Sequence, residues 1–336
     1  MKRSRLKRLL QNLALSATGL LVCVALLEIV LRLCGYGNLE IYEPDPVLYW
    51  KLKANQNCYT KVGRKPVHIN SHGTRGPEFQ TTKPPDTIRI LCLGDSRTFG
   101  WGVSEPETYS GALGRLLQER FGAARNIEVI NAGVNAWSYA QMRVYFRDGG
   151  LSQQPDFVVL GGANLWTQFS ERSSPEFVKK FMGRVRLKNF LRRFALYHFV
   201  VEVELQKVYQ RYRTRFIPVD PTRDALFKKQ QQKDPDAFFR NEILGLCRLA
   251  VEKKVKPVLL YIPTLDEMSS TEISRDLKAK IAVGRELEVP LINLMPDLAP
   301  GGKSLYLDAD PVHLNAEGNE IIARRLLASI ISSVSP

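Results

Sequence analysis

The sequence predicts an α/β domain built on a five-stranded parallel sheet, with a transmembrane helix at its N-terminus and a helical insertion. Two observations carry this prediction. Short apolar runs alternate with amphipathic stretches along most of the chain, which is typical of strands joined by crossover helices. A longer apolar run follows a basic N-terminus. The chain has 336 residues, 44% of them apolar, which is enough for one large domain with an insertion.

The N-terminal segment has the pattern of a membrane anchor. Residues 1–12 form a basic tail, and residues 13–33 form an apolar run. As a helix, this run of about 21 residues spans roughly 31 Å, close to the hydrocarbon core of a bilayer. No small-x-small cleavage site follows it. We therefore expect an uncleaved anchor with a cytoplasmic tail and the rest of the chain outside; a cleaved signal peptide is the alternative. Glu28, one turn before Arg32, is expected to be paired or to snorkel.

Residues 34–85 are rich in Pro, Gly, Asn and Tyr and show little periodicity. We expect an ordered segment, called the collar below, that links the anchor to the domain and contains one or two short strands around Val67–Asn70. A structural role is the expectation for His68 and His72 in the collar, and lining the mouth of the site is the alternative.

The domain itself is expected to cover residues 86–336. Five apolar runs are predicted strands: Ile88–Leu93, Ile127–Asn131, Asp156–Leu160, Lys256–Ile262 and Val289–Leu294. Five amphipathic stretches are predicted helices: Tyr109–Phe121, Tyr139–Gly149, Ala237–Lys254, Ile273–Leu287 and Ala316–Val334. Because strands and helices alternate, we expect a parallel sheet with helices on both faces and right-handed crossovers.

Residues 165–235 are too long for a single crossover and are expected to form the insertion. Phe190, Leu191, Phe194, Tyr197 and His198 recur at helical spacing among basic residues, which predicts a basic amphipathic helix with His198 on a half-buried face.

The net charge of +14 is concentrated in two segments. Residues 1–33 hold six basic residues against one acidic residue, and residues 172–215 hold twelve against three, so the rest of the chain is balanced. Charge confined in this way argues against nucleic acid as a partner. In an anchored protein, the basic segment at 172–215 fits anionic lipid or a polyanionic substrate, and a solvated basic face is the alternative.

Polar or glycine-rich clusters follow the predicted strands at their carboxyl ends. Ser96 follows the first strand, Gly133 the second and Asn164 the third, while Asp310 and His313 come after the fifth strand and before the last helix. The carboxyl ends of parallel strands lie at one edge of a sheet, where open α/β sheets bind ligands. These residues are therefore expected to meet in one crevice.

The residue types in this crevice suit acyl chemistry. Ser96 is the candidate nucleophile and His313 the base that accepts its proton, with the Asp310 carboxylate orienting the imidazole. Asp308 competes with Asp310 for that role, and the spacing favours Asp310. The backbone N–H groups of Ser96 and Gly133 and the side chain of Asn164 are candidate oxyanion donors.

Four short blocks resemble those of the SGNH (GDSL-type) hydrolases. The blocks are Gly94-Asp95-Ser96, Gly133, Gly162-x-Asn164 and Asp310-x-x-His313. The resemblance covers about residues 86–332 and implies a three-layer α/β/α fold and ester hydrolysis through an acyl-enzyme. It assigns the nucleophile, base, orienting acid and oxyanion donors to the same five residues. One departure is Leu165, where the third block often has Asp.

The sequence thus predicts a membrane-anchored serine esterase or acylhydrolase of the bacterial inner membrane, with its catalytic domain in the periplasm. The expected substrate is an ester or an acylated glycan or lipid, and no metal or organic cofactor is expected. An O-acyltransferase with the same triad and an idle glycan-binding scaffold are the alternatives. Three tryptophans that follow the blocks, Trp101, Trp137 and Trp166, either wall the pocket or fill its rim.

No spacing of Cys and His residues is typical of a metal site. Five cysteines are present, and Cys92 and Cys247 are expected to be buried free thiols.

Overall fold

The computed structural model describes residues 2–39, 42–60, 63–165, 169, 173–205, 234–308 and 310–334. The chain divides into two compact units, Glu40–Arg186 with Pro221–Pro336 and Met1–Leu39 with Leu187–Asp220. Trp166 and residues 206–215 of the basic segment lie outside the described residues.

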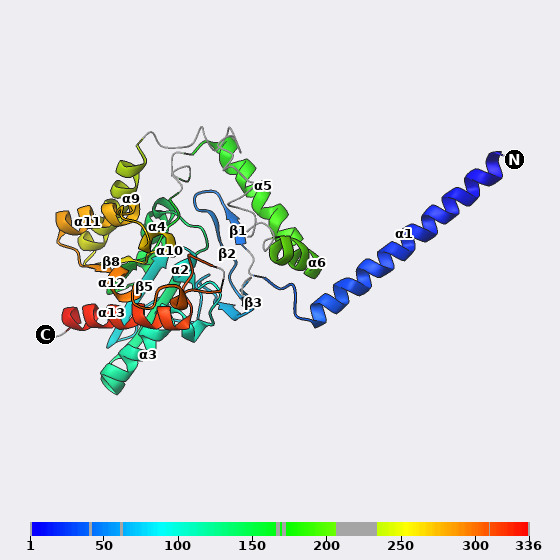
Figure 1. The fold of residues 1–336 in the computed structure, drawn as a ribbon. Helices are drawn as coiled ribbons and strands as arrows, with labels where there is room; N and C mark the ends of the chain where they lie inside the picture. The colour runs from blue at the N-terminus through cyan, green and yellow to red at the C-terminus, as the bar shows by residue number, and fades with distance from the viewer. Residues whose placement is uncertain are drawn as a thin grey trace. The chain divides into compact units, whose positions relative to one another are not determined.

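The larger unit is built on a five-stranded parallel sheet with the order β6-β5-β7-β8-β9 (Figure 1). The strands are β5 (Thr87–Gly94), β6 (Asn126–Gly133), β7 (Phe157–Leu160), β8 (Lys256–Tyr261) and β9 (Leu291–Asn293). Each lies where an apolar run predicted it. β5 is fully buried and mostly apolar, as expected for the centre of a parallel sheet, and its one charged residue, Arg89, pairs with Glu128 of β6.

Helices cover both faces of this sheet, as the alternation of side chains along β5 shows. Ile90 and Cys92 pack in one apolar cluster with residues of α3 (Tyr109–Phe121) and α13 (Ala316–Val334). Leu91 and Leu93 pack in the other cluster, with residues of three helices on the opposite face. Those helices are α4 (Tyr139–Tyr145), α9 (Pro235–Glu252) and α11 (Arg275–Leu287). The predicted three-layer α/β/α architecture is therefore confirmed.

Short elements complete the larger unit. They are α2 (Ser96–Phe99), η1 (Glu105–Glu107), η2 (Gly122–Ala124), η3 (Phe146–Gly150), η4 (Leu151–Gln153), α10 (Leu265–Met268), α12 (Met295–Leu298) and η6 (Gly302–Leu305). The sequence predicted one helix at Tyr139–Gly149. In the structure, α4 covers the first part of this range and the π-helical turn η3 covers the rest. Of these short elements, α2 is the one that contains the candidate nucleophile Ser96.

The collar contains two antiparallel hairpins, where the sequence predicted one or two strands. β1 (Tyr42–Asp45) pairs with β2 (Tyr49–Leu52), and β3 (Gln56–Tyr59) pairs with β4 (Pro66–Ile69). β1 contains Glu, Pro and Asp, which have low strand propensity, so its strand rests on pairing with β2. Beyond β4, Arg75 bridges both Ile69 and Asn131 of β6. The collar is thus joined to the edge of the main sheet.

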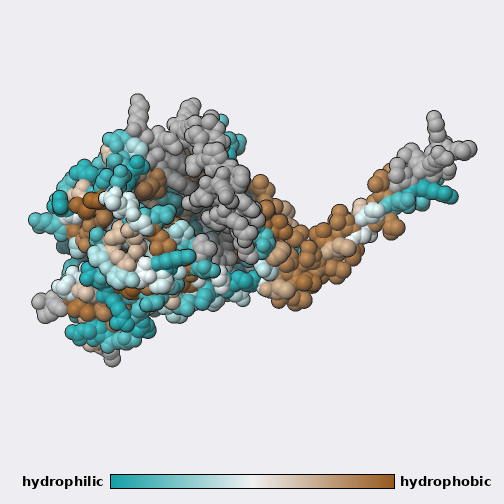
Figure 2. Space-filling view, viewed as in Figure 1, coloured by the Kyte–Doolittle hydropathy of each residue, from teal (hydrophilic) through white to brown (hydrophobic). Residues whose placement is uncertain are grey.

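In the smaller unit, α1 (Lys2–Leu33) contains the segment Leu10–Leu33, which is long and apolar enough to cross a membrane. A signal sequence passes the same test. Figure 2 shows the apolar surface of this helix as a brown band that follows a hydrophilic N-terminal end. In the most apolar stretch of 18 residues within this segment, no residue is buried inside the protein.

The predicted basic amphipathic helix of the insertion is wrong in its extent. Instead of one amphipathic helix through residues 188–198, α5 (Pro175–Leu191) ends and two short elements follow, α6 (Ala195–Tyr197) and the π-helical η5 (His198–Glu204). Phe194 adopts an extended conformation, and the carboxylate of Glu28 accepts hydrogen bonds from the N–H groups of Ala195 and Leu196, both at 2.9 Å. A carboxylate from a distant segment therefore starts a new helix. His198 is fully buried rather than half-buried.

Candidate active site

The candidate nucleophile lies at a tight strand-to-helix connection. β5 ends at Gly94 and α2 begins at Ser96, so only Asp95 separates strand from helix. Asp95 caps the helix, because its carboxylate accepts a hydrogen bond from the N–H of Arg97 at 2.9 Å. Gly100, with φ of 85°, ends the helix after a single turn. Ser96 is therefore held at the carboxyl end of the central strand.

A chain of two hydrogen bonds joins three of the predicted site residues. The Oγ of Ser96 lies 2.7 Å from Nε2 of His313, and Nδ1 of His313 lies 2.7 Å from Oδ2 of Asp310. The other carboxylate oxygen of Asp310 accepts the N–H groups of Val312 and His313 at 2.9 and 3.2 Å. A turn of three residues thus places the carboxylate against the imidazole.

The surroundings of Asp310 favour its ionised form. Burial by itself would raise the pKa of this carboxyl group, but the hydrogen bond and charge of His313, with two backbone N–H groups, lower the pKa below its ordinary value. The competing carboxylate, Asp308, is exposed. The geometry therefore favours Asp310 as the partner of His313.

Replacing Asp310 by asparagine is expected to lower kcat on a short ester about 10⁴-fold, because an amide no longer fixes the imidazole in the tautomer that accepts a proton from Ser96. Asp308→Asn is the matched control and is expected to retain activity. Steady-state kinetics on p-nitrophenyl acetate measure both variants. Equal losses in the two variants would contradict the assignment.

Two of the oxyanion donors that the sequence predicted, Asn164 and Gly133, differ in whether their donor groups already form hydrogen bonds. The side chain of Asn164 has no hydrogen-bond partner among the residues that the structure describes, and its N–H donates to the carbonyl of Trp137 at 2.9 Å. The N–H of Gly133, in contrast, donates to Oδ1 of Asn131 at 3.1 Å. The role of this N–H as an oxyanion donor stays a prediction, because the structure holds no ligand with which it could be tested.

The structure gives a separate reason for a glycine at position 133. A Cβ added there would lie 2.3 Å from the backbone nitrogen of Phe99 in α2, and Gly133 is the register partner of Gly94 in β5. The absence of a side chain lets the helix that carries Ser96 pack directly on β6. Gly133 therefore positions the nucleophile.

Ala136, three residues later, has an unusual backbone conformation that the sequence did not predict. It adopts a left-handed conformation with φ of 66°, which is uncommon for a residue with a side chain. Its N–H has no acceptor within the described part of the chain. The next residue, Trp137, contacts Asn164 through the hydrogen bond described above. No pattern in the sequence marks Ala136, since only its backbone is unusual.

A buried ion pair lies beside Ser96. The Arg97 guanidinium donates to Asp95 at 2.9 Å and to the carbonyls of Ile262 and Ala163 at 2.9 and 3.3 Å. Burial opposes the charge of Asp95, but Arg97 lowers the pKa of this carboxyl group below its ordinary value. A Cβ at Gly162 would lie 2.3 Å from Cζ of Arg97. The pair thus connects the ends of three strands.

This ion pair predicts a dependence of stability on pH. Because the pKa of Asp95 is lower in the folded than in the unfolded protein, its stabilisation is complete above about pH 4 and is lost as the pH falls through the folded pKa. Asp95→Asn is expected to lower the free energy of unfolding by about 3–5 kcal/mol near neutral pH and to reduce its decline in acid. Urea unfolding between pH 3 and 7 measures this, and parallel curves for both proteins would contradict it.

A second buried polar cluster, also missed in the sequence, supports the same sheet edge from α11. The ammonium group of Lys280 donates to the carbonyls of Gly161 and Leu260 at 2.9 and 2.7 Å and to Asp276 at 3.1 Å. Asp276 in turn accepts from the hydroxyl of Tyr139. Burial lowers the pKa of Lys280 below its ordinary value. The cluster holds the ends of β7 and β8 next to the loop that carries Asn164.

The tryptophans near the site differ in role. The ring of Trp101 lies 5.9 Å from that of His313, and both line a cleft with Ser96, so Trp101 forms part of its wall. Trp137 is fully buried and donates to the carbonyl of Trp50 at 2.9 Å, so it belongs to the core.

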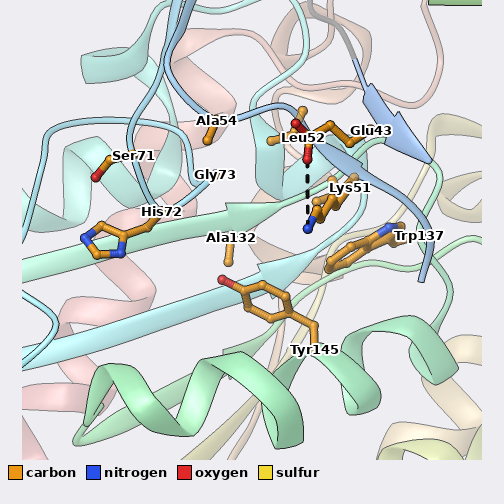
Figure 3. A pocket seen from close by; sticks show the side chains of 11 residues that line it. Glu43, Lys51, Leu52, Ala54, Ser71, His72, Gly73, Ala132, Trp137 and Tyr145 are labelled. Carbon is orange, nitrogen blue, oxygen red and sulfur yellow. Dashed lines mark ion pairs between the residues drawn. The ribbon is translucent and has the colours of Figure 1, made fainter. Parts of the chain in front are cut away.

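Figure 3 shows a separate pocket between the collar and β6. Its lining includes His72, Lys51 and Tyr145 and none of the predicted site residues. His72 and His68 are both held by hydrogen bonds within the collar, to the carbonyl of Phe79 and the side chain of Asn57. The expected structural role of these two histidines is thus supported.

The five thiols are free, and Cys92 and Cys247 are buried as expected. Burial raises the pKa of each of these two thiols to about 12. Within the described ranges, no group of three or more His, Cys, Asp or Glu side chains is arranged to hold a metal ion.

Comparisons with known proteins found one matching family model and several similar solved structures. A model of the GDSL-like lipase/acylhydrolase family matches residues 92–321. The structure is similar to a lipase/acylhydrolase from Enterococcus faecalis, with 17% identity, a TM-score of 0.45 and coverage of 74% of this chain and 98% of that one. An acetylxylan esterase from Geobacillus stearothermophilus is similar at 15% identity and a TM-score of 0.45, with 72% and 94% covered. No curated protein matches the sequence. The family match spans more than half of the chain, which therefore belongs to the GDSL-like lipase/acylhydrolase family and is an SGNH ester hydrolase.

Proposed function

We propose that the protein is a membrane-anchored serine acylhydrolase that removes an acyl or O-acetyl group from an envelope ester through an acyl-enzyme. The observation that carries the proposal is the hydrogen-bond chain from Ser96 through His313 to Asp310. Its geometry matches the order nucleophile, base and orienting acid that this chemistry needs.

In the proposed mechanism, Ser96 Oγ attacks the ester carbonyl while Nε2 of His313 takes the hydroxyl proton. The tetrahedral oxyanion accepts hydrogen bonds from the side chain of Asn164 and from the N–H groups of Ser96 and Gly133. His313 returns its proton to the leaving alcohol, which departs and leaves the acyl group on Ser96. A water molecule, activated by His313, then attacks this ester and releases the acid. Asp310 stabilises the imidazolium in both steps.

Two features support the place of the enzyme in the cell. The apolar segment of α1 is long enough to span a bilayer, and the basic residues lie on its N-terminal side. By the positive-inside rule, this arrangement leaves the catalytic domain on the periplasmic side. The substrate is then an ester of the cell envelope, such as an acylated glycan or lipid.

A fluorophosphonate probe tests the mechanism on the full-length enzyme in detergent. The probe is expected to label Ser96, as located by mass spectrometry, and the enzyme is expected to hydrolyse p-nitrophenyl acetate. His313→Ala is expected to remove both reactions. Labelling of another serine, or hydrolysis that survives His313→Ala, would contradict the proposal. Adding a sugar acceptor measures transfer; acetylated sugar formed in place of acetate would identify an acyltransferase.

Cys34 tests the membrane topology. It is exposed and directly follows α1, whereas Cys23 lies within the apolar segment. A membrane-impermeant maleimide is expected to label Cys34 in intact spheroplasts, and Cys34→Ser is the control. Labelling only after the membrane is broken would place the catalytic domain in the cytoplasm and contradict the proposed location.

A further inference from the structure

The smaller unit contains an unusual carboxylate in the apolar helix. Glu28 lies about five residues before the end of α1, which places it roughly 7–8 Å below that end. Its carboxylate pairs with Arg32 at 2.7 Å and accepts the N–H groups of Ala195 and Leu196. Since a charge at this depth needs partners, these contacts explain how the helix tolerates Glu28.

Further contacts attach the insertion to the same end of α1. The guanidinium of Arg32 donates to the carbonyl of Arg193 at 2.6 Å, and the N–H of Gly37 donates to Nδ1 of the buried His198 at 2.9 Å. The ring of Tyr36 packs edge-on against those of His198 and Phe199. Residues 193–199 are therefore held at the level of the last turns of α1.

The surface of the insertion around these contacts is apolar and basic. Six large apolar side chains in residues 187–205 are exposed: Leu187, Phe190, Phe194, Val200, Val201 and Leu205. Lys188 and Arg193 are exposed among them, and the guanidinium of Arg193 pairs with no carboxylate in the described ranges. Exposed aromatic and aliphatic side chains beside basic groups are typical of segments that lie in a membrane interface.

We infer that residues 187–205 form an interfacial platform that inserts its apolar side chains into the outer leaflet beside α1, with Arg193 and Lys188 at the lipid phosphates. The inference rests on the proposed anchoring by α1. The inference is based on the position along α1 at which Glu28 and Arg32 bind the insertion. The headgroup layer is on the order of 5–8 Å thick on each side of the hydrocarbon core. Because α1 ends at the edge of the hydrocarbon core, Glu28 lies inside the core, whereas Arg32 and Gly37 lie at or beyond its edge, so their contacts place the platform across the boundary between the core and that layer.

The experiment uses the full chain in vesicles of phosphatidylethanolamine and phosphatidylglycerol, with nitroxide labels on single cysteines in a Cys23→Ala, Cys34→Ala background. The label is placed at Phe194→Cys, at Val22→Cys within α1, and at Ile273→Cys, an exposed apolar position of the larger unit. Paramagnetic resonance compares collisions with oxygen, which partitions into lipid, and with a water-soluble nickel complex. Oxygen is expected to dominate at positions 22 and 194, and nickel at position 273.

The three labels separate the outcomes. Nickel dominance at both 22 and 194 would contradict the proposed anchoring and the platform together. Oxygen dominance at 22 with nickel dominance at 194 would overturn the platform and leave the anchor intact.

Glu28→Leu tests the docking contact, with Thr18→Leu on the same helix as the matched control. Loss of the carboxylate is expected to raise nickel collisions at position 194 and leave position 22 unchanged. An unchanged label at 194 would contradict docking through Glu28.

Discussion

Ser96→Ala is expected to lower kcat on p-nitrophenyl acetate about 10⁶-fold, to the level left by binding and oxyanion contacts alone. The Oγ of Ser96 is the atom that His313 faces at 2.7 Å, so its removal leaves the base without a nucleophile to activate. Because the side chain is small and only partly buried, the fold is expected to be retained. Circular dichroism and the thermal midpoint check the fold beside the kinetics.

Ser152→Ala is the matched control for this substitution. Ser152 is exposed, and among the residues that the structure describes its hydroxyl donates only to the carbonyl of Gly149. Its removal is expected to leave kcat and KM unchanged. If Ser96→Ala retained more than about one hundredth of the wild-type rate, the reaction would not pass through an acyl group on this serine.

Arg75→Met is expected to lower kcat at least about 10²-fold with little change in KM. The buried guanidinium of Arg75 donates to the carbonyls of Phe99, Gly100 and Val103, each at 2.7 Å. These carbonyls follow the single helical turn that begins at Ser96. Each buried carbonyl that is left without a donor costs about 1–3 kcal/mol of stability. The turn can therefore shift to regain hydrogen bonds. A displacement of about 1 Å at a reacting group costs on the order of 10²-fold in rate.

Lysine cannot replace this arginine, because one ammonium group cannot reach all three carbonyls in the geometry of the planar guanidinium. Arg75→Lys is therefore expected to recover little activity. Arg115→Met, which removes an exposed arginine paired with Glu119 and Glu320, is the matched control. A loss of thermal stability in Arg75→Met with unchanged kcat in the surviving folded enzyme would show that Arg75 serves folding alone.

Much of the fold followed from local pattern. The strands at β5 through β9 and the helix at Tyr109–Phe121 were predictable because an apolar period reports directly which side chains are buried. The approach of Ser96 to His313 and Asp310 could be expected because these residues follow strands, and the ends of parallel strands share one edge, whereas the donor role of Asn164 stays a prediction. The spacing from Asp310 to His313 is local, so a turn alone brings the pair together.

The errors arose where a distant contact decides the local structure. The packing role of Gly133 was not predicted, because its missing side chain admits α2 from a separate part of the chain. The left-handed backbone of Ala136 could not be predicted either, because no residue pattern marks it. The helix predicted through residues 188–198 ends early because Glu28 caps a new helix start. None of these contacts has a period or a spacing in the sequence.

The sequence by itself determined the order of strands and helices along the chain, the apolar N-terminal helix and the types of residue that follow the strands at the carboxyl edge of the sheet. Burial patterns and short turns encode these features locally. The tertiary structure decided how Ser96 is held, through Arg75 of the collar and Gly133 of β6. The physical reason is that buried polar groups choose their partners by three-dimensional proximity, which local sequence does not specify.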